Sequence, residues 1–101
     1  MGSRPRGKAT SWMDEKTILD DRSFTHIRVW QLPEPVFGSS HRLKYSLVYV
    51  VEHHCLLRYD NERGKGDHYH LGPCEFAYRF VSPEVLFDDF IAQVHRLRNG
   101  Q

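Results

Sequence analysis

Histidines, basic side chains and carboxylates crowd the short segment that begins at Tyr59 and ends at His70. Within it, His68 and His70 are two residues apart, so on an extended backbone they point to the same side. Arg63 and Lys65 stand just before them, separated by a glycine. Imidazoles beside cations and carboxylates can move protons around a phosphate group. The segment therefore predicts a site for phosphate chemistry, although an ordinary polar hairpin tip has a similar composition.

Metal-independent RNA cleavage needs a base for the ribose 2′-OH, an acid for the leaving 5′ oxygen, and cations that stabilise the phosphorane. The glycines Gly64 and Gly66 would let the backbone approach a phosphate and expose N–H groups to it. The candidate catalytic residues are His68, His70, Arg63 and Lys65. The residues expected to contact the substrate, by phosphate binding, hydrogen bonding or base stacking, are Arg58, Asp60, Asn61, Tyr69, Tyr78, Arg79 and Arg42.

A divalent ion is the second chemistry that this segment could support. Its ligands would come from Asp60, Asp67, His68 and His70, with His53 or His54 nearby. The spacing matches no metal motif, and Arg63 and Lys65 would repel a cation, so the phosphate interpretation is favoured and no cofactor is expected.

A cysteine nucleophile is the third possibility. Cys55 stands beside two leucines, and Cys74 has no evident orienting group, so neither matches an activated thiol. Without a secretion signal, both cysteines are expected to be free, buried thiols.

The composition limits the class of protein. A chain of 101 residues supports one small domain, and 14 Lys and Arg against 13 Asp and Glu do not by themselves indicate a nucleic-acid binder. Ten of those 14 cations are arginine, whose planar guanidinium suits phosphate. No apolar run approaches the roughly 20 residues of a membrane span, and no signal-peptide core is present. We therefore expect a cytoplasmic protein with no membrane partner.

The chain divides into a flexible N-terminal arm over residues 1–14 and one domain over residues 15–101. Alternating apolar residues predict strands at 16–19, 24–32, 43–51, 55–59 and 76–81, with the charged segment as a loop. Residues 20–23 have the composition of a hairpin turn. The strand at 43–51 is apolar on both faces towards one end, which predicts a central position.

The C-terminal segment predicts a helix from its end signals and periodicity. Ser82 is a good N-cap, Pro83 suits the first helical position, and Gly100 suits the end. Apolar residues recur at three- and four-residue spacing, so Phe90 and Ile91 are expected to be buried against the 43–51 strand. The fold predicted is α+β: a four- to five-stranded antiparallel sheet covered by this helix, with the opposite face left as a candidate binding surface.

Five segments resemble the TumE family: residues 32–35 (LPEP), 38–45 (GSSHRLKY), 58–70 (RYDNERGKGDHYH), 78–80 (YRF) and 88–94 (DDFIAQV). The resemblance extends from about residue 16 to residue 98. It implies a toxin of a bacterial or archaeal toxin–antitoxin module that acts on RNA. It also implies a neighbouring antitoxin with a helix-turn-helix DNA-binding domain. No catalytic residues are carried over from the family, so the site assignments above rest on chemistry alone.

Two hypotheses of different kinds follow. The first is an endoribonuclease toxin that uses the His68–His70 segment. The second is a non-enzymatic module that binds RNA, or only a protein partner, through the same basic segment. A homodimer is compatible with either hypothesis.

Overall fold

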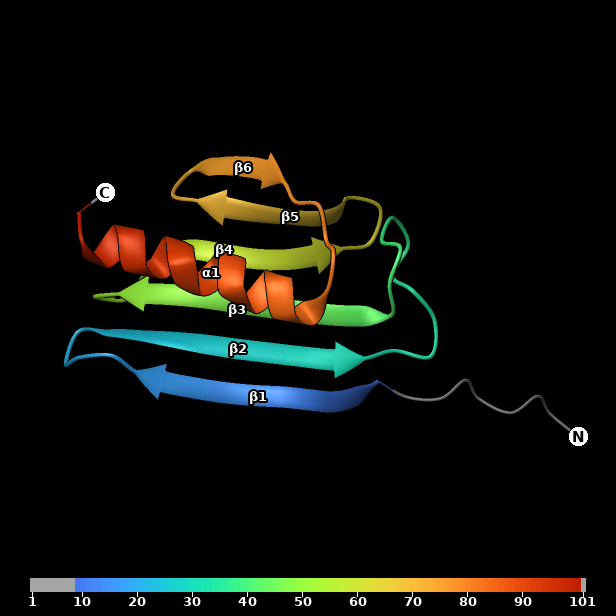
Figure 1. The fold of residues 1–101 in the computed structure, drawn as a ribbon, viewed down its shortest axis with the longest axis horizontal. Coiled ribbons are helices and arrows are strands. Elements are labelled where there is room, and N and C mark those ends of the chain that lie inside the picture. The colour runs from blue at the N-terminus through green and yellow to red at the C-terminus, as the bar shows by residue number, and fades with distance from the viewer. Residues whose placement is uncertain (1–8, 101) are drawn as a thin grey trace, which may run out of the picture.

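The computed structural model describes residues 9–100 as an antiparallel sheet of six strands followed by one helix (Figure 1). The elements are β1 (Thr10–Ile18), β2 (Ser23–Gln31), β3 (Leu43–Val51), β4 (His54–Glu62), β5 (Gly66–Leu71), β6 (Cys74–Ala77) and α1 (Pro83–Arg98). The strands lie in chain order, so every strand pairs with its sequence neighbour. The predicted α+β fold with a C-terminal cover helix is confirmed, but the sheet has six strands rather than four or five.

The strand that the sequence analysis missed is β5, which lies inside the segment expected to be a charged loop. Its residues alternate: Tyr69 and Leu71 pack towards the core, whereas His68 and His70 point to the opposite face. Because the outward positions are polar and the strand is short, its apolar face has only two members and no clear periodicity. The last strand is also displaced, since β6 ends at Ala77 and residues 78–81 form the connection to α1.

The first strand corrects the predicted N-terminal arm. Residues 1–8 lie outside the described part of the chain, but β1 already begins at Thr10, so residues 10–14 belong to the sheet. Met13 is the one partly buried residue of this edge strand. Backbone pairing with β2 from Thr10↔Gln31 to Ile18↔Phe24 holds β1 in place, with a bulge next to Met13. The strand predicted at residues 16–19 therefore begins earlier than expected, because residues 10–15 are largely exposed and carry no apolar alternation.

Helix α1 begins as predicted. The Ser82 hydroxyl accepts a hydrogen bond from the Val85 N–H at 3.2 Å, and Pro83 occupies the first turn. Three residues at four-residue spacing, Leu86, Phe90 and Val94, are buried against the sheet. Burial of Phe90 is thus confirmed, but burial of Ile91 is wrong: its side chain is 37% exposed. Each residue turns the helix by about 100°, which moves Ile91 off the buried face.

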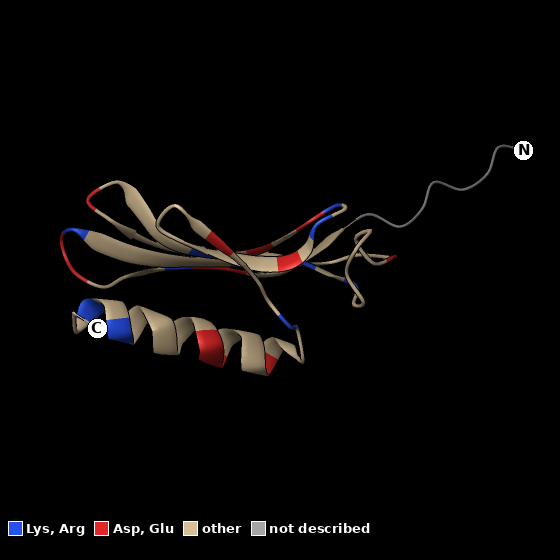
Figure 2. Ribbon diagram, turned by 90° about the horizontal axis from the view of Figure 1, so that it is seen from above, with Lys and Arg blue, Asp and Glu red and all other residues tan. Residues whose placement is uncertain are grey.

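The core lies between α1 and one face of the sheet (Figure 2). Alternate residues of the central strands point to this face, in agreement with the predicted central position of residues 43–51. The buried apolar residues are Val29, Tyr45, Leu47, Tyr49, Leu57, Tyr59, Leu86, Phe90 and Val94. Within residues 9–100, no element covers the opposite face of the sheet, which we call the open face.

Three tyrosines on the α1 side make folding sensitive to alkaline pH. Burial raises the pKa of Tyr59 to about 12. Burial also raises the pKa values of Tyr45 and Tyr78, whose hydroxyls donate to Asp67 at 2.7 Å and to Asp89 at 2.6 Å. In the unfolded chain these phenols ionise near pH 10. The unfolded state therefore loses protons that the folded state keeps, and stability falls as pH rises above about 10.

We expect the melting temperature to be nearly constant up to about pH 9.5 and to drop steeply between about pH 10 and 12. Tyrosinate absorbance followed during the same pH titration should show three of the five tyrosines ionising only as the chain unfolds. A melting temperature that is unchanged at pH 12 would contradict this account of the buried phenols.

Candidate active site on the open face

Cross-strand pairing brings the two predicted histidines to the open face together with two carboxylates. Strand β4 pairs Asp60 with His68, and strand β6 pairs Glu75 with His70. Each of these residues is on the side opposite to the buried Tyr59 and the partly buried Tyr69, because successive residues of a strand alternate between faces. The sheet thus assembles one polar site from three strands.

His68 is the buried member of this site, with a side chain only 5% exposed. Its Nε2 atom lies 2.7 Å from Asp60 Oδ1, and its Nδ1 atom lies 3.2 Å from the Gly66 carbonyl oxygen. A carbonyl oxygen can only accept, so Nδ1 carries a proton, and Nε2 presents a lone pair when the imidazole is neutral. Both Asp60 Oδ1 and His68 Nε2 are inaccessible to solvent, and neither makes an aligned hydrogen bond with any described residue. Their 2.7 Å contact is an ion pair when the imidazole is protonated.

His70 is the accessible member, with 35% of its side chain exposed. Its Nε2 atom lies 3.3 Å from Glu75 Oε1. The two imidazole rings are nearly perpendicular, at 80°, and their centroids are 5.0 Å apart. The site consequently contains two adjacent histidine–carboxylate pairs, one buried and one open to solvent.

Lys65 is the predicted cation that reaches the histidines most closely. Its Nζ atom lies 3.4 Å from Glu75 Oε1, and it lines a hollow of about 210 Å³ together with His68 and Glu75. A second hollow, of about 190 Å³, is lined by His70 and by Arg58, its cross-strand partner on β4. Three other predicted cationic residues are exposed away from the imidazoles: Arg63 at the hairpin tip, Arg42 just before β3, and Arg79 in the connection to α1.

The carboxylates outnumber the ammonium group around the buried imidazole. Glu62 and Glu75 each place an oxygen 3.8 Å from His68 Nε2, in addition to the close contact of Asp60. Three carboxylates and one lysine give this cluster a formal charge of −2, before the histidines are counted. The sequence predicted the cations but did not reveal how the register gathers the acids.

Asn61 and the tyrosines expected to contact substrate lie on the α1 side instead. Asn61 is fully buried and donates to the Leu43 carbonyl at 2.7 Å. Tyr69 stacks between Tyr59 and Phe76, with centroids 4.9 Å from each. These contacts use the polar and aromatic groups within the fold, so the structure does not bring Asn61 or Tyr69 to the histidines. The same holds for Tyr78, whose hydroxyl bonds Asp89.

Asp67 also points to the α1 side, which removes it from the predicted set of metal ligands. Its carboxylate accepts hydrogen bonds from His41 Nε2 at 2.6 Å, the Tyr45 hydroxyl at 2.7 Å and the Ser39 hydroxyl at 2.8 Å. The other His41 nitrogen accepts the Leu43 N–H at 3.1 Å. Each of these groups has a hydrogen-bond partner, so the network holds the connection before β3 against the β4–β5 hairpin. No local pattern indicated the role of His41, because it lies 26 residues from Asp67.

Gly64 and Gly66 were expected to bind phosphate, but both contact the connection between β2 and β3 instead. Gly66 is buried at φ +75°, and a Cβ atom there would lie 2.7 Å from the Gly38 carbonyl oxygen. Gly64 donates its N–H to the Phe37 carbonyl at 2.7 Å. Their backbone groups are therefore directed at the neighbouring connection rather than at a ligand.

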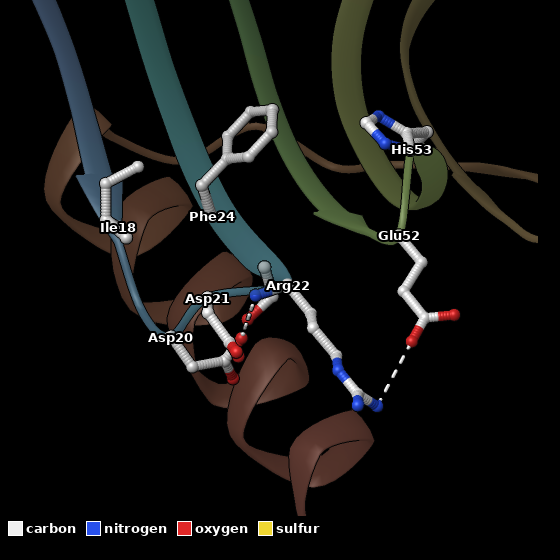
Figure 3. Close-up of a pocket in the computed structure, with 8 residues that line it drawn as sticks. Ile18, Asp20, Asp21, Arg22, Phe24, Glu52 and His53 are labelled. Atoms are coloured by element: carbon white, nitrogen blue, oxygen red, sulfur yellow. Dashed lines mark hydrogen bonds and ion pairs between the residues drawn. The ribbon is translucent and has the colours of Figure 1, made fainter.

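His53 lies in the turn that joins β3 to β4, and His54 is the first residue of β4, so both are at the other end of the sheet. Asp60 comes six positions after His54 on β4, which is about 20 Å along a strand, so neither histidine can join the site. Figure 3 shows the pocket at that end, where Arg22 reaches Glu52 at 3.3 Å and three of the eight lining residues, Asp20, Asp21 and Glu52, carry carboxylates.

Both cysteines are free but exposed, which corrects their predicted burial. Cys55 lies at the start of β4, beside a pairing irregularity, and Cys74 lies on the edge strand β6. Neither position is covered by α1.

The open face also carries aromatic side chains paired with cations on the first two strands. Arg28 lies over the Trp30 ring at 5.1 Å, and the Lys16 ammonium lies 4.2 Å from the centre of the Phe24 ring. We call these four residues the aromatic–basic strip. The strip places two aromatic rings and two cations on the uncovered side of the sheet.

Comparison with known proteins adds the family. No curated protein and no solved structure matches the chain at a significant level. Among the described residues, no helix is long and apolar enough to span a membrane. The family model for the toxin TumE matches residues 8–98, a range that includes all six strands, both histidines and the cover helix. This chain therefore belongs to the TumE toxin family, and its function is that of a toxin component in a toxin–antitoxin system with an antitoxin partner.

Proposed function

We propose that this toxin is a metal-independent endoribonuclease whose acid and base are His68 and His70. The observation that carries the proposal is the pairing of two adjacent imidazoles with carboxylates, at 2.7 and 3.3 Å, on the open face. Cleavage by the ribose 2′-OH needs two proton transfers on opposite sides of one phosphate. Two histidines whose rings are 5.0 Å apart are suited to divide this task.

The accessible His70 would exchange a proton directly with RNA, because its side chain is 35% exposed. Glu75 would orient the His70 ring and stabilise its charged form, as carboxylates do for catalytic histidines. Lys65 and Arg58, one on each side of the histidine pair, would contact the phosphate. A phosphate near Lys65 competes with Glu75 for the ammonium, so substrate binding would release the present 3.4 Å contact.

The aromatic–basic strip supports RNA as the substrate. Bases stack on exposed aromatic rings, and arginine adds both charge and a planar surface. The half-buried rings of Trp30 and Phe24 lie on the same side of the sheet as the histidines. A single strand of RNA could therefore run from the site on β5 towards β2.

A second candidate, a binding module that does not cleave RNA, is favoured by one specific observation. His68 is almost fully buried and three carboxylates surround its Nε2 atom. Such a cluster repels phosphate until the imidazoles are protonated. On this alternative, the toxin would block its target by binding RNA or a protein through the same open face.

Mapping of RNA 5′ ends in cells distinguishes the two candidates. The chain would be expressed with and without its antitoxin, beside the variant His70→Ala and the matched control His53→Ala, which changes an exposed histidine at the far end of the sheet. Cleavage predicts new 5′ ends with the wild-type chain and the control, but not with His70→Ala. Growth arrest without new ends would favour the binding module.

The antitoxin is expected to neutralise the toxin by covering the open face around Lys65 and His70. We propose a helix-turn-helix antitoxin whose acidic and apolar groups complement Lys65, Arg63 and the aromatic–basic strip. Hydrogen exchange of the complex should then show protection of β5 and of the β4–β5 hairpin. Protection confined to α1, with the open face unchanged, would indicate an indirect block instead.

A further inference from the structure

We infer that Asp60, His68 and His70 form a binding site for one divalent transition-metal ion, whose occupancy shuts off RNA cleavage. The metal site stands on the geometry alone, and only its inhibitory effect rests on the proposed function. One ligand atom from each residue lies within 4.8 Å of the other two. Donors around a tetrahedral zinc ion, with bonds of about 2.0–2.1 Å, are about 3.4 Å apart. Small side-chain movements are thus enough to close these three ligands on an ion.

The second observation that points to a cation is a pair of buried atoms that have no hydrogen-bond partner within residues 9–100. Asp60 Oδ1 and His68 Nε2 are 2.7 Å apart and inaccessible to solvent, and they make no aligned hydrogen bond within residues 9–100. Because Nδ1 of His68 donates to the Gly66 carbonyl, the Nε2 lone pair of the neutral imidazole faces a negatively charged oxygen. Two buried acceptors at this distance repel each other unless a proton or a metal ion lies between them.

The His68 tautomer is also the one that a metal ligand requires. Histidines that bind metals usually donate their other ring N–H to a backbone carbonyl or carboxylate, which fixes the ring and its lone pair. The Gly66 carbonyl makes this contact at 3.2 Å. His70 contributes the second imidazole at the solvent side, where an ion can enter.

Charge favours a cation here, contrary to the repulsion expected from Arg63 and Lys65. Arg63 is exposed at the hairpin tip, and Lys65 is 3.4 Å from Glu75 and 4.0 Å from Glu62. Glu75 lies 3.3 Å from His70 Nε2 and 3.8 Å from His68 Nε2, so it can supply a fourth ligand. Two imidazoles with carboxylates suit zinc, cobalt or nickel, whereas magnesium prefers oxygen ligands alone.

Occupancy and cleavage exclude each other, because the ion takes the imidazole lone pairs that proton transfer needs. Zinc would therefore inhibit the toxin, and a chelator would restore its activity.

Zinc titration of the untagged full-length chain by calorimetry tests the site. We expect one ion per chain, and at least about tenfold weaker binding in His70→Gln and in Asp60→Asn, by analogy with the loss that altered metal shells cause. The control His53→Gln should bind zinc as the wild type does. Cobalt(II) should give the absorption bands of a tetrahedral site, and magnesium should give no binding heat. Circular dichroism of each variant establishes that it is folded.

Equal zinc binding by wild type, His70→Gln and Asp60→Asn would overturn the site, and so would the absence of binding. The inhibitory effect has its own readout, which is RNA cleavage with and without zinc. Zinc that binds at the site but leaves cleavage unchanged, or increases it, would overturn the inhibition. If the metal-free chain never cleaves RNA, the proposed function fails, while the zinc titration still decides the metal site.

Discussion

Replacement of His70 by alanine is expected to lower the rate of RNA cleavage by about 10²–10⁴-fold, the usual contribution of a general acid or base. The same loss is expected for His68, and the double variant should be inactive. Binding of an uncleavable RNA should change far less, because Lys65, Arg58 and the aromatic–basic strip make most of the contacts that hold it. The measurement is single-turnover cleavage beside equilibrium binding, with both assays done in a chelator.

The Lys65→Ala variant is the matched comparison, since it removes charge without removing a proton-transfer group. It should weaken binding as well as cleavage and reduce the dependence of binding on salt. A double His68→Ala, His70→Ala chain that still cleaves RNA and arrests growth would refute the assignment of acid and base.

Replacement of Phe90 by alanine is expected to cost about 3–5 kcal/mol of unfolding free energy, the range for a buried aromatic residue. Phe90 is fully buried in the middle of α1 and packs edge-on against Tyr59, with ring centroids 5.9 Å apart. Small domains have total stabilities of about 5–15 kcal/mol, so this single change should remove much of the stability. Urea denaturation followed by circular dichroism measures the loss.

The neighbouring Ile91 provides the control, because it is 37% exposed. The change Ile91→Ala should cost much less than Phe90→Ala. Equal losses at the two positions would contradict the packing of α1 described above.

The sequence predicted those elements whose apolar residues follow a regular period. Strand β3 is apolar at every second residue, and α1 has an N-cap, a proline and a four-residue apolar spacing, so their bounds were close to those observed. Strand β5 was missed, and β1 was predicted only over residues 16–19, for one physical reason. Each lies away from the centre of the sheet, where few residues are buried and backbone pairing replaces apolar contacts as the stabilising interaction.

For the site, the sequence identified His68 and His70 as a pair on one side of an extended segment. It could not assign the faces of Asp60 and Asp67, which depend on the register between β4 and β5. That register sends Asp60 to the histidines and Asp67 to His41 on the other side. Glu75 is likewise placed by the pairing of β6, which no local pattern revealed. Long-range pairing therefore decides which of the polar residues share a site.

End-group analysis of RNA incubated with the purified toxin in a chelator tests the central claim most directly. Attack by the ribose 2′-OH, with His68 and His70 as base and acid, predicts one product with a 2′,3′-cyclic phosphate and one with a 5′-hydroxyl. An RNA whose ribose at the cleaved position lacks the 2′-OH should remain intact. Products with 5′-phosphate ends, or RNA that stays uncut under all these conditions, would contradict the account.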